Sequence, residues 1–244
     1  MNVSGRSDVG MLPSENQDAF GECVLKNGAH LAVLCDGMGG VSGGREAAEI
    51  CVRTFLSAYA GKDAANEEDL RSTLHVANEA ILADATKNGY IGTGTTLVLA
   101  LAEYNQVTLF WVGDSRGYLL HEGTLSRLTR DHSYVQELVD AGEISEKEAR
   151  THKKRHLITR AVGATPSVVP DVYRFPWSNG DRLLLCSDGL FGMVEEKEIE
   201  EILKEEYPTA RTVHELVCAA NSHGGEDNVT VVLLENIKEN YPDA

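Results

Sequence analysis

Apolar residues in this chain gather into short runs that end at glycine, asparagine or charged residues. The run at 29–35, AHLAVLC, stops at an Asp-Gly pair and has the pattern of a buried strand. The short links at 103–105 and 122–123 predict hairpins between the strands that flank them. Runs and alternations of similar length predict the remaining strands: 95–102, 106–112, 117–121, 124–128, 171–175, 182–186 and 229–235.

Other segments have the period of an amphipathic helix. From residue 44 to about 59, apolar residues such as Cys51 and Phe55 recur every three or four positions, with charged residues on other faces. Similar patterns predict helices at 67–85, 134–141, 145–151, 195–205 and 209–221. Strands and helices come in blocks rather than in strict alternation, and no linker or repeat divides the chain. We therefore expect one domain of the α+β class with antiparallel sheets.

The balance of charge argues against two classes of partner. Lys and Arg number 22 against 38 Asp and Glu, which gives a formal net charge of −16. A nucleic acid or an anionic membrane surface would repel such a chain. No apolar run approaches the roughly 18 residues of a membrane helix, and the N-terminus is too polar for a signal peptide. Five cysteines without a CxxC pair fit a reducing compartment, so we expect a cytoplasmic protein.

Aspartates carry the chemical information in the chain, because most of them lie directly against an apolar strand. They are Asp18, Asp36, Asp114, Asp188 and Asp227. Carboxylates gathered at strand ends would form an oxygen-rich pocket suited to Mg²⁺ or Mn²⁺, and the spacing favours this interpretation. The alternative is that Asp-Gly pairs such as Asp36-Gly37 simply mark turns. The glycine-rich stretch 36–44 matches neither nucleotide-binding fingerprint, so we do not expect nucleotide binding.

The motifs around these aspartates resemble, in order and over nearly the whole chain, the metal-dependent protein phosphatase family, protein phosphatase 2C, in its compact bacterial form. One such motif would be weak evidence, whereas eight in the right order are strong. They are Ser7-Asp-Val-Gly10 with Asn16-Gln-Asp18, Cys35-Asp-Gly-Met-Gly-Gly40, Gly94-Thr-Thr96, Val112-Gly-Asp-Ser-Arg116, Leu128-Thr-Arg-Asp-His-Ser133, Ile158-Thr-Arg-Ala-Val-Gly163, Leu183-Leu-Leu-Cys-Ser-Asp-Gly-Leu190 and Glu226-Asp-Asn-Val-Thr230.

The resemblance implies a four-layer αββα sandwich, in which two antiparallel β-sheets are flanked by helices. It also implies a single catalytic domain over 1–244 with a flap at about 132–160. Asp36, the Gly37 carbonyl, Asp188 and Asp227 would hold two Mn²⁺ or Mg²⁺ ions. Asp18 would support this cluster through water, and Asp114 would hold a third, weaker ion together with Asp188.

The activity that the resemblance implies is hydrolysis of phosphoserine and phosphothreonine on proteins by a hydroxide that bridges the two metals. Asp36, Asp188 and Asp227 would be the catalytic residues. A bacterial serine/threonine kinase would be the opposing enzyme, phosphorylated proteins the substrates, and the phosphatase a monomer.

Departures from the family pattern lie in the first and second motifs. Family members carry an arginine that grips the substrate phosphate three residues before the Asn, where this chain has Pro13. Gln17 replaces a glutamate, and Met38 stands where eukaryotic relatives have a histidine that acts as general acid. The candidates for a substitute phosphate-binding cation are Arg6, Arg45 and Arg116. A catalytically weakened pseudophosphatase that binds phosphoproteins is therefore the alternative function.

A basic segment, 150–160, interrupts this acidic chain within the predicted flap. It holds five Lys or Arg and no acid. Lys153, Lys154 and Arg155 at its centre would steer acidic or phosphorylated substrates toward the metals. A solvated loop without function is the alternative. His132, His152 and His156 lie in or near the flap. We expect each of them to be an exposed surface histidine rather than a catalytic one.

Overall fold

The computed structural model describes residues 1–39 and 43–237, so residues 40–42 of the glycine-rich stretch lie outside the described part. The strands within it are β1 (Asn2–Asp8), β2 (Asp18–Val24), β3 (His30–Met38), β4 (Gly94–Thr95), β5 (Leu97–Ala102), β6 (Gln106–Val112), β7 (Arg116–His121), β8 (Thr124–Arg127), β9 (Asp171–Pro176), β10 (Arg182–Cys186) and β11 (Val229–Glu235). They form two antiparallel sheets, one of five strands in the order β1-β11-β10-β7-β8 and one of six with β2-β3-β5-β6-β9 in order and β4 beside β3.

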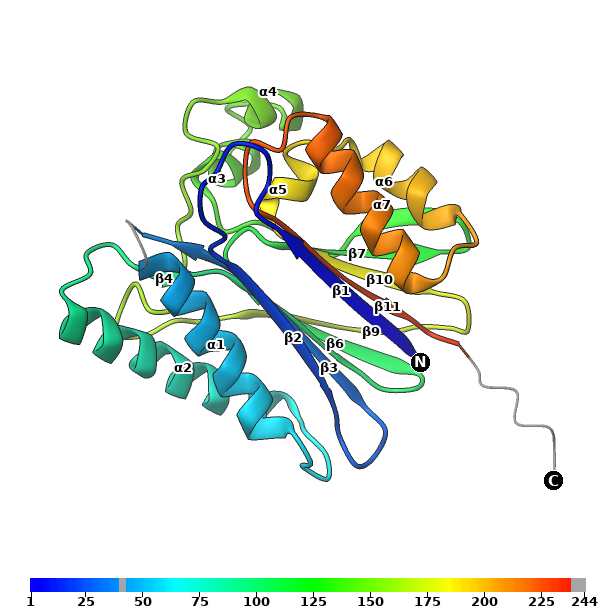
Figure 1. Cartoon of the computed structure of the whole chain (residues 1–244), viewed down its shortest axis with the longest axis horizontal. Coiled ribbons are helices and arrows are strands. Elements are labelled where there is room, and N and C mark those ends of the chain that lie inside the picture. Colours follow the sequence, from blue (N-terminus) through cyan, green and yellow to red (C-terminus); the bar gives the residue numbers. More distant parts are fainter. Residues whose placement is uncertain (40–42, 238–244) are drawn as a thin grey trace.

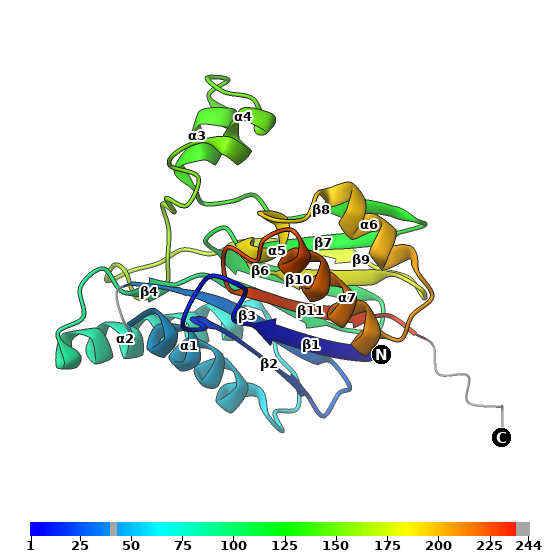
Figure 2. The same ribbon diagram turned by 45° about the horizontal axis from the view of Figure 1, so that its top comes forward.

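Helices cover the outer face of each sheet (Figure 1). The helices of the described part of the chain are α1 (Gly43–Tyr59), α2 (Glu67–Asn88), α3 (Tyr134–Asp140), α4 (Glu146–Thr151), α5 (Asp188–Phe191), α6 (Glu196–Lys204) and α7 (Thr209–Ser222). Helices α1 and α2 lie on the six-stranded sheet, and α5 to α7 lie on the five-stranded one. Helices α3 and α4 stand away from the sandwich in the turned view (Figure 2).

Three layers of buried side chains hold the four layers of structure together. Phe55 of α1 packs in the layer between the helices and the six-stranded sheet. Leu34 and Leu185 belong to the layer between the two sheets, and Leu216 of α7 belongs to the layer on the far side. The strands between these layers are buried on both faces, which is why the sequence shows continuous apolar runs rather than alternation. The predicted αββα sandwich is confirmed.

Two strands and one helix escaped the sequence analysis. Strand β1 is an edge strand with few large apolar residues, and Ser4 and Ser7 form hydrogen bonds with hydroxyls of Thr209 and Thr230. Strand β2 is likewise short of large apolar residues, and α5 has only four residues. The strand predicted at 95–102 is divided, because Gly94–Thr95 pairs with the end of β3 and Leu97–Ala102 with its first half.

The predicted flap segment, about 132–160, contains α3 and α4 and joins the sandwich through a narrow neck. Tyr134 N donates to Leu157 O at 2.8 Å, and Thr159 N donates to His132 O at 2.8 Å. These bonds hold the two chain segments of the neck side by side, with both short helices beyond them.

None of the helices in the described part of the chain combines the length and the apolar character that crossing a membrane requires. All five cysteines lie within the described residues, and all are free thiols.

Candidate functional site

The first pair of acids comes from two neighbouring strands of the six-stranded sheet. Asp18 opens β2 and lies opposite Asp36 in the register of β3. Thr96 fixes the backbone at Asp36, since its N–H donates to Asp36 O at 2.8 Å and its Oγ1 accepts from Asp36 N at 2.9 Å. The sheet therefore sets the position of both carboxylates before any ligand is present.

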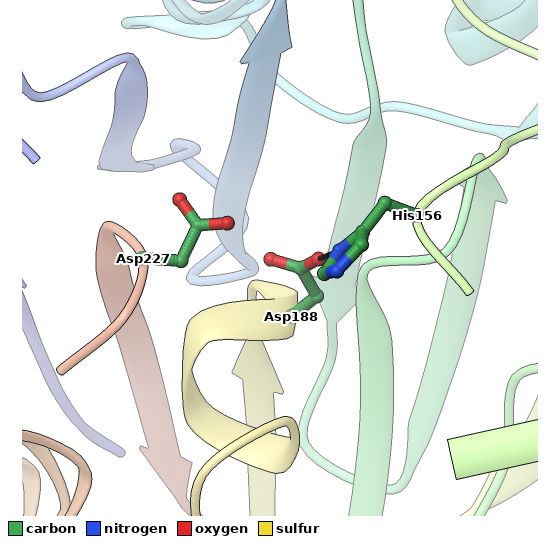
Figure 3. Close-up of side chains that lie close together, drawn as sticks. All are labelled: His156, Asp188 and Asp227. Atoms are coloured by element: carbon green, nitrogen blue, oxygen red, sulfur yellow. Dashed lines mark ion pairs between the residues drawn. The ribbon is translucent and has the colours of Figure 1, made fainter. Parts of the chain in front are cut away.

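The second pair comes from the five-stranded sheet. Asp188 begins α5 just after β10, and Asp227 precedes β11, the strand beside β10. Figure 3 shows the two carboxylates with His156 beside Asp188. Ligand atoms of these three side chains all lie within 4.8 Å of one another. Asp36, Asp188 and Asp227 line a cavity of about 610 Å³. Asp114, which follows β6, lines it as well.

The glycines after two of these aspartates are required by close packing rather than by a turn. Strand β3 continues through Gly37 to Met38, and α5 includes Gly189. A Cβ on Gly37 would lie 2.1 Å from Gly44 O, and one on Gly189 would lie 2.0 Å from Asn228 O. The alternative that these Asp-Gly pairs simply mark turns is therefore wrong.

Two polar side chains that the sequence analysis did not single out tie the acids together. Ser187 Oγ donates to Asp18 Oδ2 at 2.8 Å and so links the two sheets. Asn228 Oδ1 accepts from Gln17 N at 2.7 Å, while its Nδ2 donates to the Val9 and Glu15 carbonyls. The bond to Gln17 spans 211 positions of sequence, which explains why the pattern of single segments gives no sign of it.

Burial, and after it the crowding of the carboxylates, raises the pKa values of these acids. Burial, aided by the charges of Asp188 and Asp227, raises the pKa of Asp18 to about 7 against hydrogen bonds that lower it. Burial and then neighbouring acids also raise the pKa values of Asp36 and Asp114 well above the usual range, and that of Asp227 to a lesser degree. A site in which several acids resist ionisation is one that bound cations would stabilise.

The donor set fits hard divalent cations. Asp18 Oδ1 is buried and has no hydrogen-bond partner, so the cluster offers an oxygen that the protein itself leaves unsatisfied. Carboxylate and carbonyl oxygens are the ligands that Mg²⁺ and Mn²⁺ prefer. Asp36, Gly37, Asp188 and Asp227 line the cavity, and Asp18 lies opposite Asp36 on the neighbouring strand.

Comparison with known sequences identifies the family. A sequence profile described as protein phosphatase 2C matches residues 13–229. The chain belongs to the protein phosphatase 2C family. This confirms the resemblance drawn from the motifs, and with it the class of enzyme, a metal-dependent protein serine/threonine phosphatase.

Similar members of the protein phosphatase 2C family span the whole chain. The serine/threonine phosphatase stp of Listeria monocytogenes is 40% identical over 241 residues, which are 96% of each chain. Protein phosphatase PhpP of Streptococcus pneumoniae is 36% identical over 244 residues, covering 98% of this chain and 99% of PhpP.

Solved structures of the family agree with the fold. The serine/threonine phosphatase PstP/Ppp of Mycobacterium tuberculosis superposes with a TM-score of 0.89 at 36% identity, covering 97% of this chain and 99% of that one. The catalytic domain of a phosphatase PstP, crystallised in complex with two manganese ions, gives a TM-score of 0.86 at 35% identity, with 97% and 98% covered.

Two of the candidate phosphate-binding cations, Arg6 and Arg45, lie away from the cavity that the acids line. Arg6 is exposed on the edge strand β1, and Arg45 of α1 donates to Glu49 at 2.9 Å. Neither belongs to the described residues that line the cavity, whereas Arg116 does.

Some side chains of the basic segment, 150–160, line the cavity and others do not. Lys153 is exposed, and the Lys154 ammonium lies 4.8 Å from the centre of the Tyr134 ring. Arg155 and His156, in contrast, line the cavity. Only His156 of the three flap histidines comes to the acids, with Nδ1 3.7 Å from Asp188 Oδ2, and this carboxylate raises the pKa of His156. Its place was not predicted, because the loop at 152–158 has no regular period.

Proposed function

We propose that this chain hydrolyses phosphoserine and phosphothreonine esters on proteins with the help of two divalent metal ions, Mn²⁺ or Mg²⁺. Asp36, the Gly37 carbonyl, Asp188 and Asp227 would hold the two ions. Asp18 would support them from below, and Asp114 with Asp188 would hold a third, weaker ion. When bound, such ions lower the pKa of water toward about 7 and offset charge on phosphoryl oxygens.

The observation that carries this proposal is the buried Asp18 Oδ1 without a partner, opposite Asp36 in the pairing of β2 with β3 and so next to a cavity to which both sheets contribute acids. A purely structural cluster would satisfy that oxygen with a hydrogen bond, as Ser187 satisfies Oδ2. The unsatisfied atom and the raised pKa values both favour a cationic ligand.

The protein's own groups supply position and orientation. Asp36 lies on β3 of one sheet and Asp188 begins α5 directly after β10 of the other, so elements of both sheets hold these acids around the cavity. The carboxylates repel a phosphate group. A substrate phosphate therefore binds in the cavity only when cations offset their charge. His156 lies beside Asp188 on the flap side of the cavity.

We infer the substrate class from the names of the relatives, and the opposing kinase from the resemblance to the family. Those from Listeria and Streptococcus are named as serine/threonine or protein phosphatases, and the present chain matches them from end to end. We therefore infer phosphorylated proteins as substrates and a bacterial serine/threonine kinase as the opposing enzyme, with residues 1–244 acting as one catalytic domain and the segment at 132–160 as its flap.

The test is turnover of p-nitrophenyl phosphate by the purified chain with Mn²⁺. EDTA should abolish it, and Asp188→Asn should lower kcat/KM by at least about 100-fold, the loss that removing even an outer partner of a metal ligand produces. Asp84→Asn, on α2 and outside the described residues that line the cavity, is the matched control and should leave turnover unchanged.

A weakened pseudophosphatase is the second candidate, because Pro13 removes the arginine that the family uses to grip phosphate. It predicts binding of phosphopeptides without turnover. Absence of turnover on p-nitrophenyl phosphate and on phosphoserine peptides, with the metal present, would overturn the enzyme proposal in its favour.

A further inference from the structure

The cavity is rich in acids, so a substrate phosphate needs a cation from the protein as well as the metals. A guanidinium suits this task because it donates two parallel hydrogen bonds to phosphate oxygens. The described residues that line the cavity include four arginines: Arg116, Arg127, Arg150 and Arg155. The contacts of each arginine decide which of them is free to bind a phosphate.

Two of these arginines are bound to the same carboxylate. Arg116 donates from Nε and Nη2 to Asp131, the shorter bond being 2.8 Å, and its guanidinium stacks 3.6 Å from the centre of the Phe191 ring. Arg127 forms an ion pair with Asp131 as well, and the Asp131 side chain is only 7% exposed. Withdrawing either arginine would leave a buried carboxylate with less compensation, which is costly.

Arg150 is also committed. It lies 3.0 Å from Glu195 and donates to the Phe191 carbonyl at 3.3 Å, which ties α4 to the end of α5. Because it donates to a backbone oxygen in addition to forming the ion pair, releasing it would remove contacts that hold α4 beside α5.

Arg155 differs from the other three. Among the described residues its guanidinium pairs with Glu226 Oε2 at 3.9 Å, and the two side chains are 40% and 57% exposed. An exposed pair at that distance contributes less than about 1 kcal/mol. The position is nevertheless at the mouth of the acid cluster, since Glu226 precedes Asp227 and His156, the next residue, lies 3.7 Å from Asp188.

We propose that Arg155 is the side chain that binds the phosphoryl group of the substrate, and that Glu226 holds it in reserve until a phosphate arrives. The loose ion pair with Glu226 keeps the guanidinium beside the cavity, and an incoming dianion displaces the weaker carboxylate partner. This inference rests on the proposed phosphatase function, because it assigns a residue to the phosphate of that reaction.

The first test is the dissociation constant of inorganic phosphate for the Mn²⁺-loaded protein, measured by titration calorimetry. Arg155→Met should weaken binding by about tenfold, the factor that about 1.4 kcal/mol supplies, with a matching rise in KM for p-nitrophenyl phosphate. Arg155→Lys should fall between, since an ammonium keeps the charge and loses the fork. Lys147→Met, an exposed α4 cation outside the cavity lining, is the control and should bind phosphate as the parent does.

The second test is the pair with Glu226. Glu226→Gln should tighten phosphate binding by about twofold to threefold, because it releases the arginine from an exposed ion pair. In the Arg155→Met background the same change should have a much smaller effect, and this non-additivity is the mark of a shared contact. Equal effects of Glu226→Gln in both backgrounds would mean that it acts through general charge, and would overturn the role of Glu226.

Failure of this inference is distinguishable from failure of the proposed function. If the parent protein turns over p-nitrophenyl phosphate and Arg155→Met binds phosphate as tightly as the parent, the phosphatase stands and the role of Arg155 is overturned. If the parent shows no turnover but Arg155→Met weakens phosphate binding tenfold, the role of Arg155 stands as that of a phosphate-binding residue in a protein without the proposed activity.

Discussion

The acid cluster and the flap line the same cavity but are held in different ways. The acids lie on or directly beside strands of the two sheets, and hydrogen bonds such as Ser187 to Asp18 fasten one sheet to the other. Helix α4 of the flap has no buried residue, and its attachments outside the neck are side-chain contacts such as Arg150 with Glu195. The rigid region therefore suits metal chemistry, and the exposed region suits recognition of varied substrates.

The largest expected effect is on the stability of the metal-free protein, when a substitution removes one charge from the acid cluster. The pKa of Asp18 is about 7 in the folded protein against 3.8 in its ordinary state. The folded state therefore retains a proton that the unfolded state loses, and stability falls as pH rises from about 4 through 7. The loss for this one group amounts to up to about 4 kcal/mol. With EDTA present, Tm should fall between pH 5 and pH 8, and Asp18→Asn should reduce that fall.

Two comparisons support this measurement. Mn²⁺ should raise Tm most at pH 8, where the carboxylates are ionised and repel one another. Asp84→Asn should leave the pH dependence as in the parent, because Asp84 lies on α2 and is not among the described residues that line the cavity. If Asp18→Asn leaves the fall in Tm at its parental size, the acid cluster does not oppose folding.

The same contrast explains how much of the site the sequence could predict. The acids at Asp36 and Asp188 are visible because each follows its own apolar strand and precedes a glycine that close packing requires. The frame around them is not visible, because Asn228 and Gln17 meet only after the chain has folded. Strand β1 was missed for a similar reason, since its side chains meet hydroxyls rather than an apolar core.

In the flap, composition predicted a basic segment but not the direction of its side chains. Lys154 and Arg155 are neighbours in sequence, yet Lys154 lies over the Tyr134 ring and Arg155 lines the cavity. The loop that carries them has no helical or strand period from which a face can be assigned. Which cation faces the acids is therefore a property of the neck and of the Glu226 contact, both of which depend on tertiary structure.

An arginine placed at position 13 would test whether the rigid region can take over phosphate binding from the flap. The loop before Pro13 is fastened to the sandwich, with Met11 N donating to Gly225 O at 2.8 Å. If Arg155 replaces the arginine that the family carries at position 13, Pro13→Arg should recover most of the tenfold loss in Arg155→Met. In the parent background it should tighten phosphate binding by only about twofold, since one cation already serves. The measurement is the dissociation constant of inorganic phosphate, and equal gains in both backgrounds would contradict the exchange of roles.

The smallest effect is expected from the flap lysines that do not line the cavity. Lys153→Glu with Lys154→Glu changes the charge of the flap by −4 and leaves Arg155 in place, so long-range attraction is altered together with the contact between Lys154 and the Tyr134 ring. Steering predicts that kcat/KM on a phosphoprotein falls by about threefold to tenfold at low salt and recovers above about 0.15 M, where the Debye length is about 8 Å. The phosphate dissociation constant should stay nearly constant, in contrast to Arg155→Met. An unchanged kcat/KM at low salt would show that the basic segment acts through Arg155 at close range, and that its lysines belong to a solvated loop.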